Sequence, residues 1–162
     1  MNYWITVHYP PWEGDKPSPL LPDPEYYYRI YLPDGRQSAG EELQPSDYVF
    51  IYESKTGKAL KSGIRYRKGK YGVVALVKAL SSIIENPESK PEEYLYSPPI
   101  NWKWQVSTQI KELGFCSHDN VCKILEYSTD YTFLGFGDHH SGLKKLTAEQ
   151  FIRLLHCFRA CV

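Results

Sequence analysis

The sequence has few of the patterns that would assign it to several large classes of protein. Its four cysteines form no Cys-x-x-Cys pair, and their spacing from histidine fits no common zinc-binding frame. No apolar run is long enough to span a membrane, and no signal-peptide pattern is visible. We therefore expect reduced thiols, a cytoplasmic location and neither a metal nor another cofactor.

The sequence also has no net charge, which excludes a general attraction for polyanions, but its charge is unevenly distributed. Residues 1–53 carry nine acidic and three basic residues, whereas residues 54–84 carry eight basic residues and no acidic one. Such a basic segment is typical of a phosphate-binding patch, and equally of a solvated hairpin whose lysines protect an edge. The candidate phosphate-binding residues are Lys55, Lys58, Lys61, Arg65, Arg67, Lys68 and Lys70.

Aromatic residues, by contrast, are abundant, with 14 tyrosines and four tryptophans among 162 residues. They are used heavily both by β-rich cores and by surfaces that stack on nucleic-acid bases. A hydrophobic content of 42% and a charged content of 23% are ordinary for a soluble globular protein. The length suits a single domain over residues 1–162.

Short runs of aromatic and β-branched residues predict several strands. An apolar run at residues 48–52 and another at residues 72–80 predict two core strands on either side of the basic segment. Further strands are predicted at residues 3–9, 26–32, 102–107 and 131–136. Ser117 is placed to cap a short helix, and Thr147 with Gln150 forms a capping box for a C-terminal helix. This pattern predicts an α+β domain around a curved, mostly antiparallel sheet or small barrel.

Aromatic and polar residues near the predicted strand ends are candidates for a ligand pocket. Trp102 and Trp104 face the same side of a strand, where two indoles either cap a core or form the walls of a slot for a planar ligand. A flipped or unpaired base is bound by stacking of this kind together with hydrogen bonds to its edge. His8 and Tyr9 end the first predicted strand just before Trp12, which is a common arrangement at the mouth of a pocket.

The glycine-containing segment at residues 135–142 is a second candidate site. Asp138 with His139 or His140 offers acid–base chemistry, which would suit a small hydrolase or a deaminase-like enzyme. No Ser or Cys nucleophile motif and no complete metal-nuclease motif accompanies these residues. We favour two other interpretations over catalysis: a purely structural loop, or a loop in which Asp138 accepts a hydrogen bond from a ligand amine.

Three segments resemble the EVE family, a branch of the PUA-like superfamily related to YTH and ASCH domains: Asn2–Ile5, Pro45–Tyr52 and Gly142–Phe151. The similarity extends over nearly the whole chain. Its most specific part is the middle segment, where the family usually has Pro-Gly-Asp and this chain has Ser46 in place of the glycine. The resemblance implies a PUA-like curved β-barrel or sheet that is flanked by short helices and a C-terminal helix.

The resemblance also implies a function. In relatives, an aromatic-lined pocket accepts a modified base that is flipped out of a duplex or taken from a single strand. EVE-like modules also occur fused to nucleases or to motor proteins of modification-dependent restriction systems. By position, the pocket of this chain would include His8, Tyr9, Trp12, Tyr31, Ser54, Trp102 and Trp104, and the basic segment would lie beside it. Ser54 and Asp138 are the side chains that we expect to read the edge of the base.

We therefore predict a binding module and not an enzyme: a reader of a methylated base such as 5-methylcytosine, flipped out of DNA, in a restriction or defence setting. The alternatives are an RNA-binding PUA-like domain, a small enzyme that uses Asp138 with His139 or His140, and a protein-interaction scaffold whose aromatic residues form only the core. One stacked base gives modest affinity, so a linked nuclease or motor domain, or oligomerisation, is the expected partner.

Overall fold

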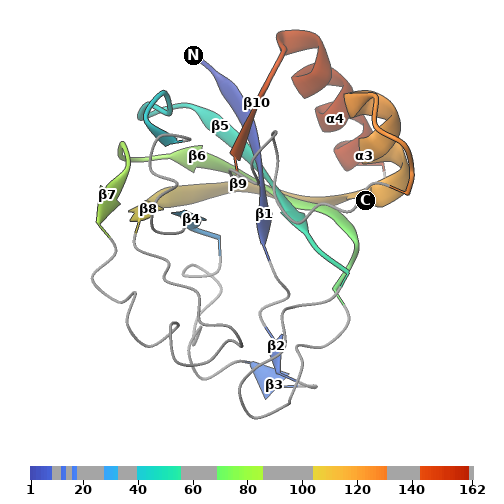
Figure 1. Cartoon of the computed structure of the whole chain (residues 1–162), viewed down its shortest axis with the longest axis horizontal. Coiled ribbons are helices and arrows are strands. Elements are labelled where there is room, and N and C mark those ends of the chain that lie inside the picture. Colours follow the sequence, from blue (N-terminus) through green and yellow to red (C-terminus); the bar gives the residue numbers. More distant parts are fainter. Residues whose placement is uncertain are drawn as a thin grey trace.

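The structure is a computed structural model that describes residues 1–8, 12–13, 16–17, 28–32, 40–55, 69–85, 104–130 and 143–160, with the backbone alone for 12–13 and 16–17. Figure 1 shows the arrangement of its helices and strands. The strands are β1 (Tyr3–His8), β2 (Trp12–Glu13), β3 (Lys16–Pro17), β4 (Ile30–Leu32), β5 (Tyr48–Glu53), β6 (Gly72–Ala79), β7 (Ile84–Glu85), β8 (Trp104–Val106), β9 (Thr108–Ser117) and β10 (Leu143–Leu146). The helices are α3 (His118–Leu125) and α4 (Ala148–Ala160). Neither helix is long and apolar enough to cross a membrane.

The main sheet has five strands in the order β10-β1-β5-β6-β9. β1 and β5 are parallel, and the other neighbouring pairs are antiparallel. β5 and β6 lie at the centre, as their apolar sequences predict, and Lys78 is the one residue of β6 that is not buried. Strands covered on both faces need apolar side chains on both, which explains why these runs do not alternate with polar residues.

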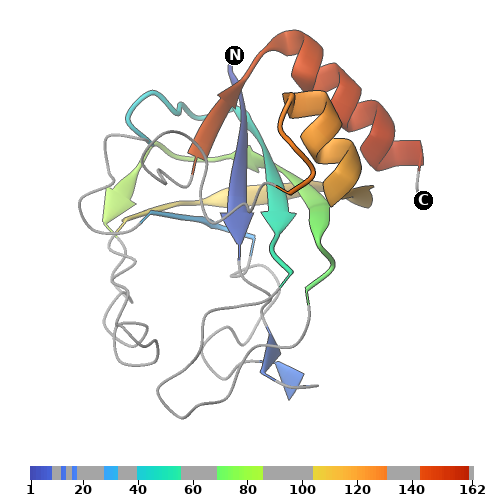
Figure 2. The same cartoon turned by 45° about the vertical axis from the view of Figure 1, so that its right-hand side comes forward.

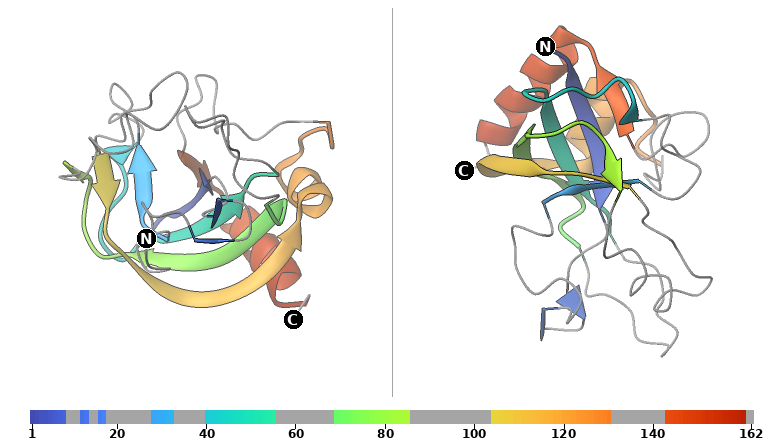
Figure 3. Two further views of the ribbon diagram at one scale, coloured as in Figure 1. Left: turned by 90° about the horizontal axis from the view of Figure 1, so that it is seen from below. Right: turned by 90° about the vertical axis from the view of Figure 1, so that its left-hand side faces the viewer.

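Two apolar cores lie on opposite faces of this curved sheet. On one face, α3 and α4 cover a core that contains Ile5, Phe50 and Leu154. On the concave face, a second core contains Trp4, Ile51 and apolar residues of β4 and β8, two strands of the small sheet β4-β8-β7. Figures 2 and 3 show the helices on one side of the sheet and the small sheet on the other. Within the described residues the strands do not close into a barrel, because β10 and β9 each pair along one edge only.

A tight turn leads into β5 at the start of the segment Pro45–Tyr52, which resembles the EVE family. Asp47 N donates a hydrogen bond to Gln44 O (3.1 Å), and Ser46 has a φ of 80°. With Pro45 before it, this is a type II turn, whose third residue favours glycine because of its positive φ. The buried Asp47 carboxylate accepts a hydrogen bond from Trp4 Nε1 (3.0 Å), so the turn ties the start of β5 to β1.

The two predicted helix caps are confirmed. Ser117 is the N-cap of α3, and its hydroxyl accepts a hydrogen bond from Asn120 N (3.4 Å). In the capping box of α4, Gln150 N donates to Thr147 Oγ1 (3.1 Å) and Thr147 N donates to Gln150 Oε1 (3.0 Å). Each cap satisfies amide groups that the first helical turn leaves without partners.

Five of the described strands were not predicted from the sequence: the two-residue strands β2, β3 and β7, and the longer strands β9 and β10. β9 has ten residues, but its sequence mixes polar residues and a glycine without a clear alternation, and its pairing with β6 decides its conformation. β10 pairs with β1 after the segment that contains the predicted 131–136 strand, which lies outside the described residues. The predicted strand at 26–32 is observed as β4 only.

Candidate functional site

Three neighbouring strands of the main sheet start or finish side by side, at the same edge perpendicular to the strands. His8 at the end of β1 pairs with Glu53 at the end of β5, and Glu53 pairs with Gly72 at the start of β6. Ser54 N donates to His8 O (2.9 Å), so the β1–β5 pairing continues beyond the strands. We call this edge the rim and define it as His8, Glu53–Lys55 and Lys70–Gly72; it is the lower edge of the sheet in Figure 1.

Four polar side chains at or near the rim are buried. Thr6, His8, Glu53 and Ser54 are 1%, 8%, 4% and 7% exposed. Since side chains alternate along a strand, Thr6 and His8 face the same side as Trp4 in the concave core. Burying polar groups is costly unless they form hydrogen bonds, so such a cluster is retained where it serves a ligand or a network.

Two tyrosines form a wall beside this cluster. The rings of His8 and Tyr31 are 6.1 Å apart between centroids and tilted by 43°. Tyr28 packs against the concave core. Burial, and after it the charge of Glu53, raises the pKa of the Tyr28 hydroxyl, which therefore stays protonated at neutral pH and can donate a hydrogen bond. The site thus combines aromatic surface with a donor and a carboxylate, the groups that recognise a planar polar ligand.

Gln105 extends the wall across the small sheet. It is the strand partner of Tyr31, and the two side chains share a face. Gln105 is 6% exposed, and its Oε1 atom has no hydrogen-bond partner among the residues that the structure describes. A buried acceptor in this position is available to a ligand amine or hydroxyl.

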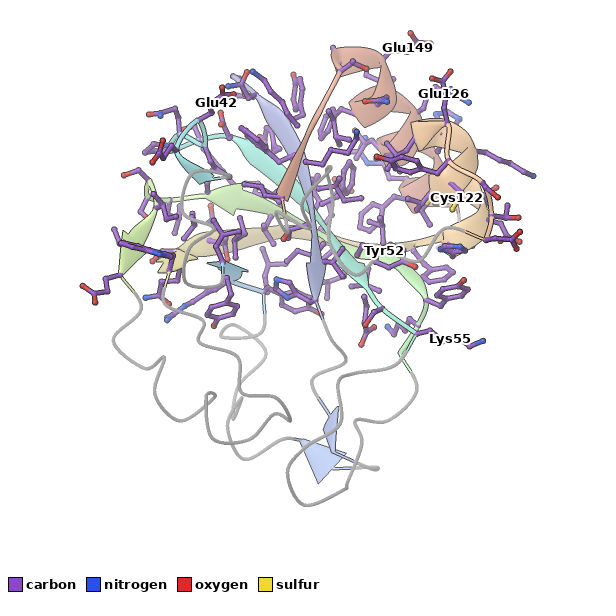
Figure 4. All side chains as sticks on the ribbon, viewed as in Figure 1. Glu42, Tyr52, Lys55, Cys122, Glu126 and Glu149 are labelled. Atoms are coloured by element: carbon purple, nitrogen blue, oxygen red, sulfur yellow. The ribbon has the colours of Figure 1, made fainter. Side chains whose placement is uncertain are left out.

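The basic segment leaves the sheet and returns to it at the rim. Gly69 N donates to Lys55 O (2.7 Å), and Lys70 N donates to Glu53 Oε2 (3.3 Å). Lys55 and Lys70 are both exposed, and Figure 4 shows Lys55 beyond the end of β5. Two cations therefore border the polar cluster.

Of the predicted pocket, the structure brings together His8, Tyr31 and Ser54 at the rim. Trp104 is half-buried and packs against the concave core, away from the rim. In the small sheet it pairs with Leu32 and Glu85. The other predicted site residues lie outside the residues whose side chains are described: Tyr9, Trp12, Lys58, Lys61, Arg65, Arg67, Lys68, Trp102, Asp138, His139 and His140.

Four residues of the site were missed in the sequence: Thr6, Tyr28, Glu53 and Gln105. Glu53 carried a usable signal, since it continues the inward alternation of Val49 and Ile51 at the end of an apolar strand. Gln105 did not, because its burial depends on the pairing of β8 with β4 and β7. In the described parts of the chain, no three His, Cys, Asp or Glu side chains meet in a group that could hold a metal ion.

Comparison with known proteins identifies the fold. No family model matches the sequence, and no curated protein sequence matches it. The structure is similar to human THYN1 in complex with DNA containing 5-methylcytosine, at 15% identity, with 96% of each chain covered and a TM-score of 0.53. It is also similar to a hypothetical protein from Leishmania major (13% identity, 99% of this chain and 96% of that chain, TM-score 0.53). A Pseudomonas syringae protein matches over 95% of this chain and 97% of its own, at 11% identity and a TM-score of 0.51.

These similarities confirm the fold that the resemblance implied. The chain has an α+β, EVE-like fold of the PUA-like type, with a curved, mostly antiparallel sheet and a C-terminal helix.

Proposed function

We propose that this chain is a single-domain reader of nucleic acid, which captures one modified base at the rim, flipped out of a DNA duplex or taken from a single strand. The observation that carries the proposal is the buried polar cluster beside two tyrosines and two exposed lysines. The supporting comparison is the shared fold with THYN1, a protein solved in complex with 5-methylcytosine DNA.

In this proposal Glu53 reads the edge of the base. A carboxylate accepts a hydrogen bond from an exocyclic amine, which cytosine and adenine have and thymine lacks. Tyr28 and Ser54 supply hydroxyl donors for a ring nitrogen or carbonyl, and Gln105 Oε1 supplies a further acceptor. The site therefore favours a methylated cytosine or adenine over thymine or uracil.

Aromatic rings and cations supply the remaining binding energy. His8 and Tyr31, with Tyr9, Trp12 or Trp102, would stack on the base, at about 1–3 kcal/mol for each stacked base. Lys55 and Lys70, with the other basic residues of 54–70, would hold the phosphates. Asp138 remains a candidate contact to the base edge.

The biological setting is part of the same proposal. A reader with one pocket binds with modest affinity, so a linked or associated nuclease or motor domain of a modification-dependent defence system would supply the effect of recognition. We propose no catalytic activity for the chain itself.

The test is a titration in which the tryptophan fluorescence of the protein is followed. The ligands are 12-base-pair DNA duplexes that carry cytosine, 5-methylcytosine, 5-hydroxymethylcytosine or N6-methyladenine at one position. Matched RNA and single-stranded DNA are titrated alongside, at low and moderate salt. The proposal expects binding that depends on the modification and weakens with salt. Binding that ignores the modification would reduce the site to a basic patch, and absence of binding at low salt would refute the proposal. Tighter binding of RNA would favour the RNA-binding alternative.

The variant Glu53→Gln keeps the size of the side chain and removes its charge. Hydrogen bonds to charged groups contribute about 1.5–3 kcal/mol, so we expect at least a tenfold loss of affinity for the modified duplex. The matched control is Glu42→Gln, at the opposite end of the sheet in Figure 4, where the carboxylate is 71% exposed and forms a solvent-exposed ion pair with Lys145. Equal affinities of the two variants would exclude Glu53 from the reading site.

A further inference from the structure

Tyr71 has an uncommon backbone conformation for an aromatic residue. Its φ is 59°, in the left-handed region that favours glycine, and its side chain is 36% exposed. Asparagine and glycine occupy this region with less strain than a bulky residue does. A strained residue on an exposed rim, next to a proposed binding site, is a reason to look for a function of its ring.

The Tyr71 ring is held by a buried histidine. It stacks on the imidazole of His118, with centroids 4.1 Å apart and planes inclined by 14°. His118 is 2% exposed, and its Nε2 donates to Thr129 O (2.8 Å), so its Nδ1 accepts the hydrogen bond from the Tyr52 hydroxyl (2.9 Å). Two hydrogen bonds therefore fix the imidazole plane, and the stacked Tyr71 ring is fixed with it. His118 N also donates to Tyr71 O (3.0 Å).

The position of this ring relates it to the proposed base site. Tyr71 directly precedes Gly72, the strand partner of Glu53, which in turn pairs with His8. Two strand spacings, about 10 Å, separate His8 from the start of β6 along the rim. The Tyr71 ring lies on the helix-covered side of the sheet, where His118 bonds to Tyr52 of that core. A nucleic-acid strand that binds both sites would therefore pass over the rim from the concave side to the helix side.

Lys55 lies between the two sites. It follows Ser54 of the base site, and its Nζ lies over the Tyr71 ring, 5.6 Å from the centroid, in a cation–π contact that a stacked base would displace. A cation in this place is suited to a phosphate that joins one nucleotide on the concave side to the next on Tyr71.

Acidic residues also face Tyr71. Partial burial and, after it, Cys122, Asp119 and Asp130 raise the pKa of its hydroxyl. The phenol is therefore uncharged at neutral pH, and the two carboxylates disfavour a phosphate on their side of the ring. The contact expected at Tyr71 is stacking on the ring.

We infer that Tyr71 is a second stacking platform, which takes the unpaired base next to the captured one while Lys55 binds the phosphate between them. This inference rests on the proposed function, and it adds a substrate class: a strand that is single or opened over at least two nucleotides. A 5-methylcytosine strand should then bind at least as tightly single-stranded as in a duplex.

The test is a cycle that combines protein variants with abasic probes. The probe is a single-stranded DNA heptamer with a central 5-methylcytosine, and two further probes have an abasic site on its 5′ or 3′ side. Tyr71→Asn removes the ring and tolerates the left-handed backbone, Tyr71→Gly removes both ring and strain, and Tyr71→Phe keeps the ring. We expect Asn and Gly to lower affinity for the intact probe about tenfold, and Phe to change it less than twofold.

On one of the two abasic probes, wild type and Tyr71→Asn should bind equally, because the platform has no base to hold. An unchanged affinity of Tyr71→Asn and Tyr71→Gly for the intact probe would overturn the inference. An equal loss of affinity for the intact probe and for both abasic probes would also overturn it, because that result indicates a purely structural role through His118. The melting temperatures of the variants report that role directly. If wild type binds the methylated duplex but none of these single-stranded probes, the inference has failed and the proposed function stands; if it binds neither, the proposed function itself has failed.

Discussion

Replacing Ser46 with glycine is expected to stabilise the protein, because Ser46 occupies the position of the type II turn that has a positive φ. Its φ is 80°, and its side chain is exposed. Its amide donates to Ala79 O (2.8 Å), which joins the turn to the end of β6, and glycine keeps that bond. The substitution therefore removes backbone strain and little else.

The expected change in the free energy of unfolding is the difference between two opposing contributions. A left-handed conformation costs a non-glycine residue about 1–2 kcal/mol. Glycine loses more conformational freedom on folding, which costs about 0.5–1 kcal/mol. The net stabilisation is about 1 kcal/mol, and for a chain of this length that raises the Tm by about 2–4 °C.

Thermal and urea unfolding, followed by circular dichroism, would measure this gain. Ser82→Gly is the matched control, since Ser82 is also exposed but is not among the described residues with a positive φ, and this variant should lose stability. If Ser46→Gly loses stability as Ser82→Gly does, the turn assigned to Pro45 and Ser46 is wrong. The same result would remove the physical account of why the EVE family usually has glycine there.

Two further predictions concern buried groups next to α3 and α4. Burial raises the pKa of Tyr52 above its ordinary value, so the unfolded chain ionises first as the pH rises; stability is fully present below about pH 10 and falls above it. Urea unfolding between pH 8 and 11 should show this decline, with a smaller slope in Tyr52→Phe, and an equal slope in the variant would contradict it. The sulfur atoms of Cys116 and Cys157 lie 2.7 Å apart, so glutathione disulfide should oxidise the pair, forming one protein disulfide and two molecules of glutathione. The cross-link should stabilise the fold by about 2–4 kcal/mol, with Cys157→Ser as the control; a mass spectrum of the oxidised protein without the Cys116–Cys157 peptide pair would refute it.

Local signals in the sequence predicted much of the fold. The apolar runs that became β5 and β6 have no helical spacing, and their burial on both faces follows from that composition. The capping residues Ser117 and Thr147 marked the helix starts because each cap is a local hydrogen bond. β9 was missed because the edge of β6 decides its conformation, and a partner strand cannot be read from ten residues of mixed composition.

The candidate site, too, was predictable from the sequence only in part. The sequence by itself determined that His8, Ser54 and Lys55 stand at strand ends and that a basic segment separates two core strands. Only the tertiary structure decided that β1 and β5 run parallel, so that both end at one edge and bring His8 beside Glu53. It also decided that Gln105 is buried and that Tyr71 stacks on His118. These contacts join residues far apart in the chain, and the pairing of strands that creates them depends on the whole sheet and not on any one segment.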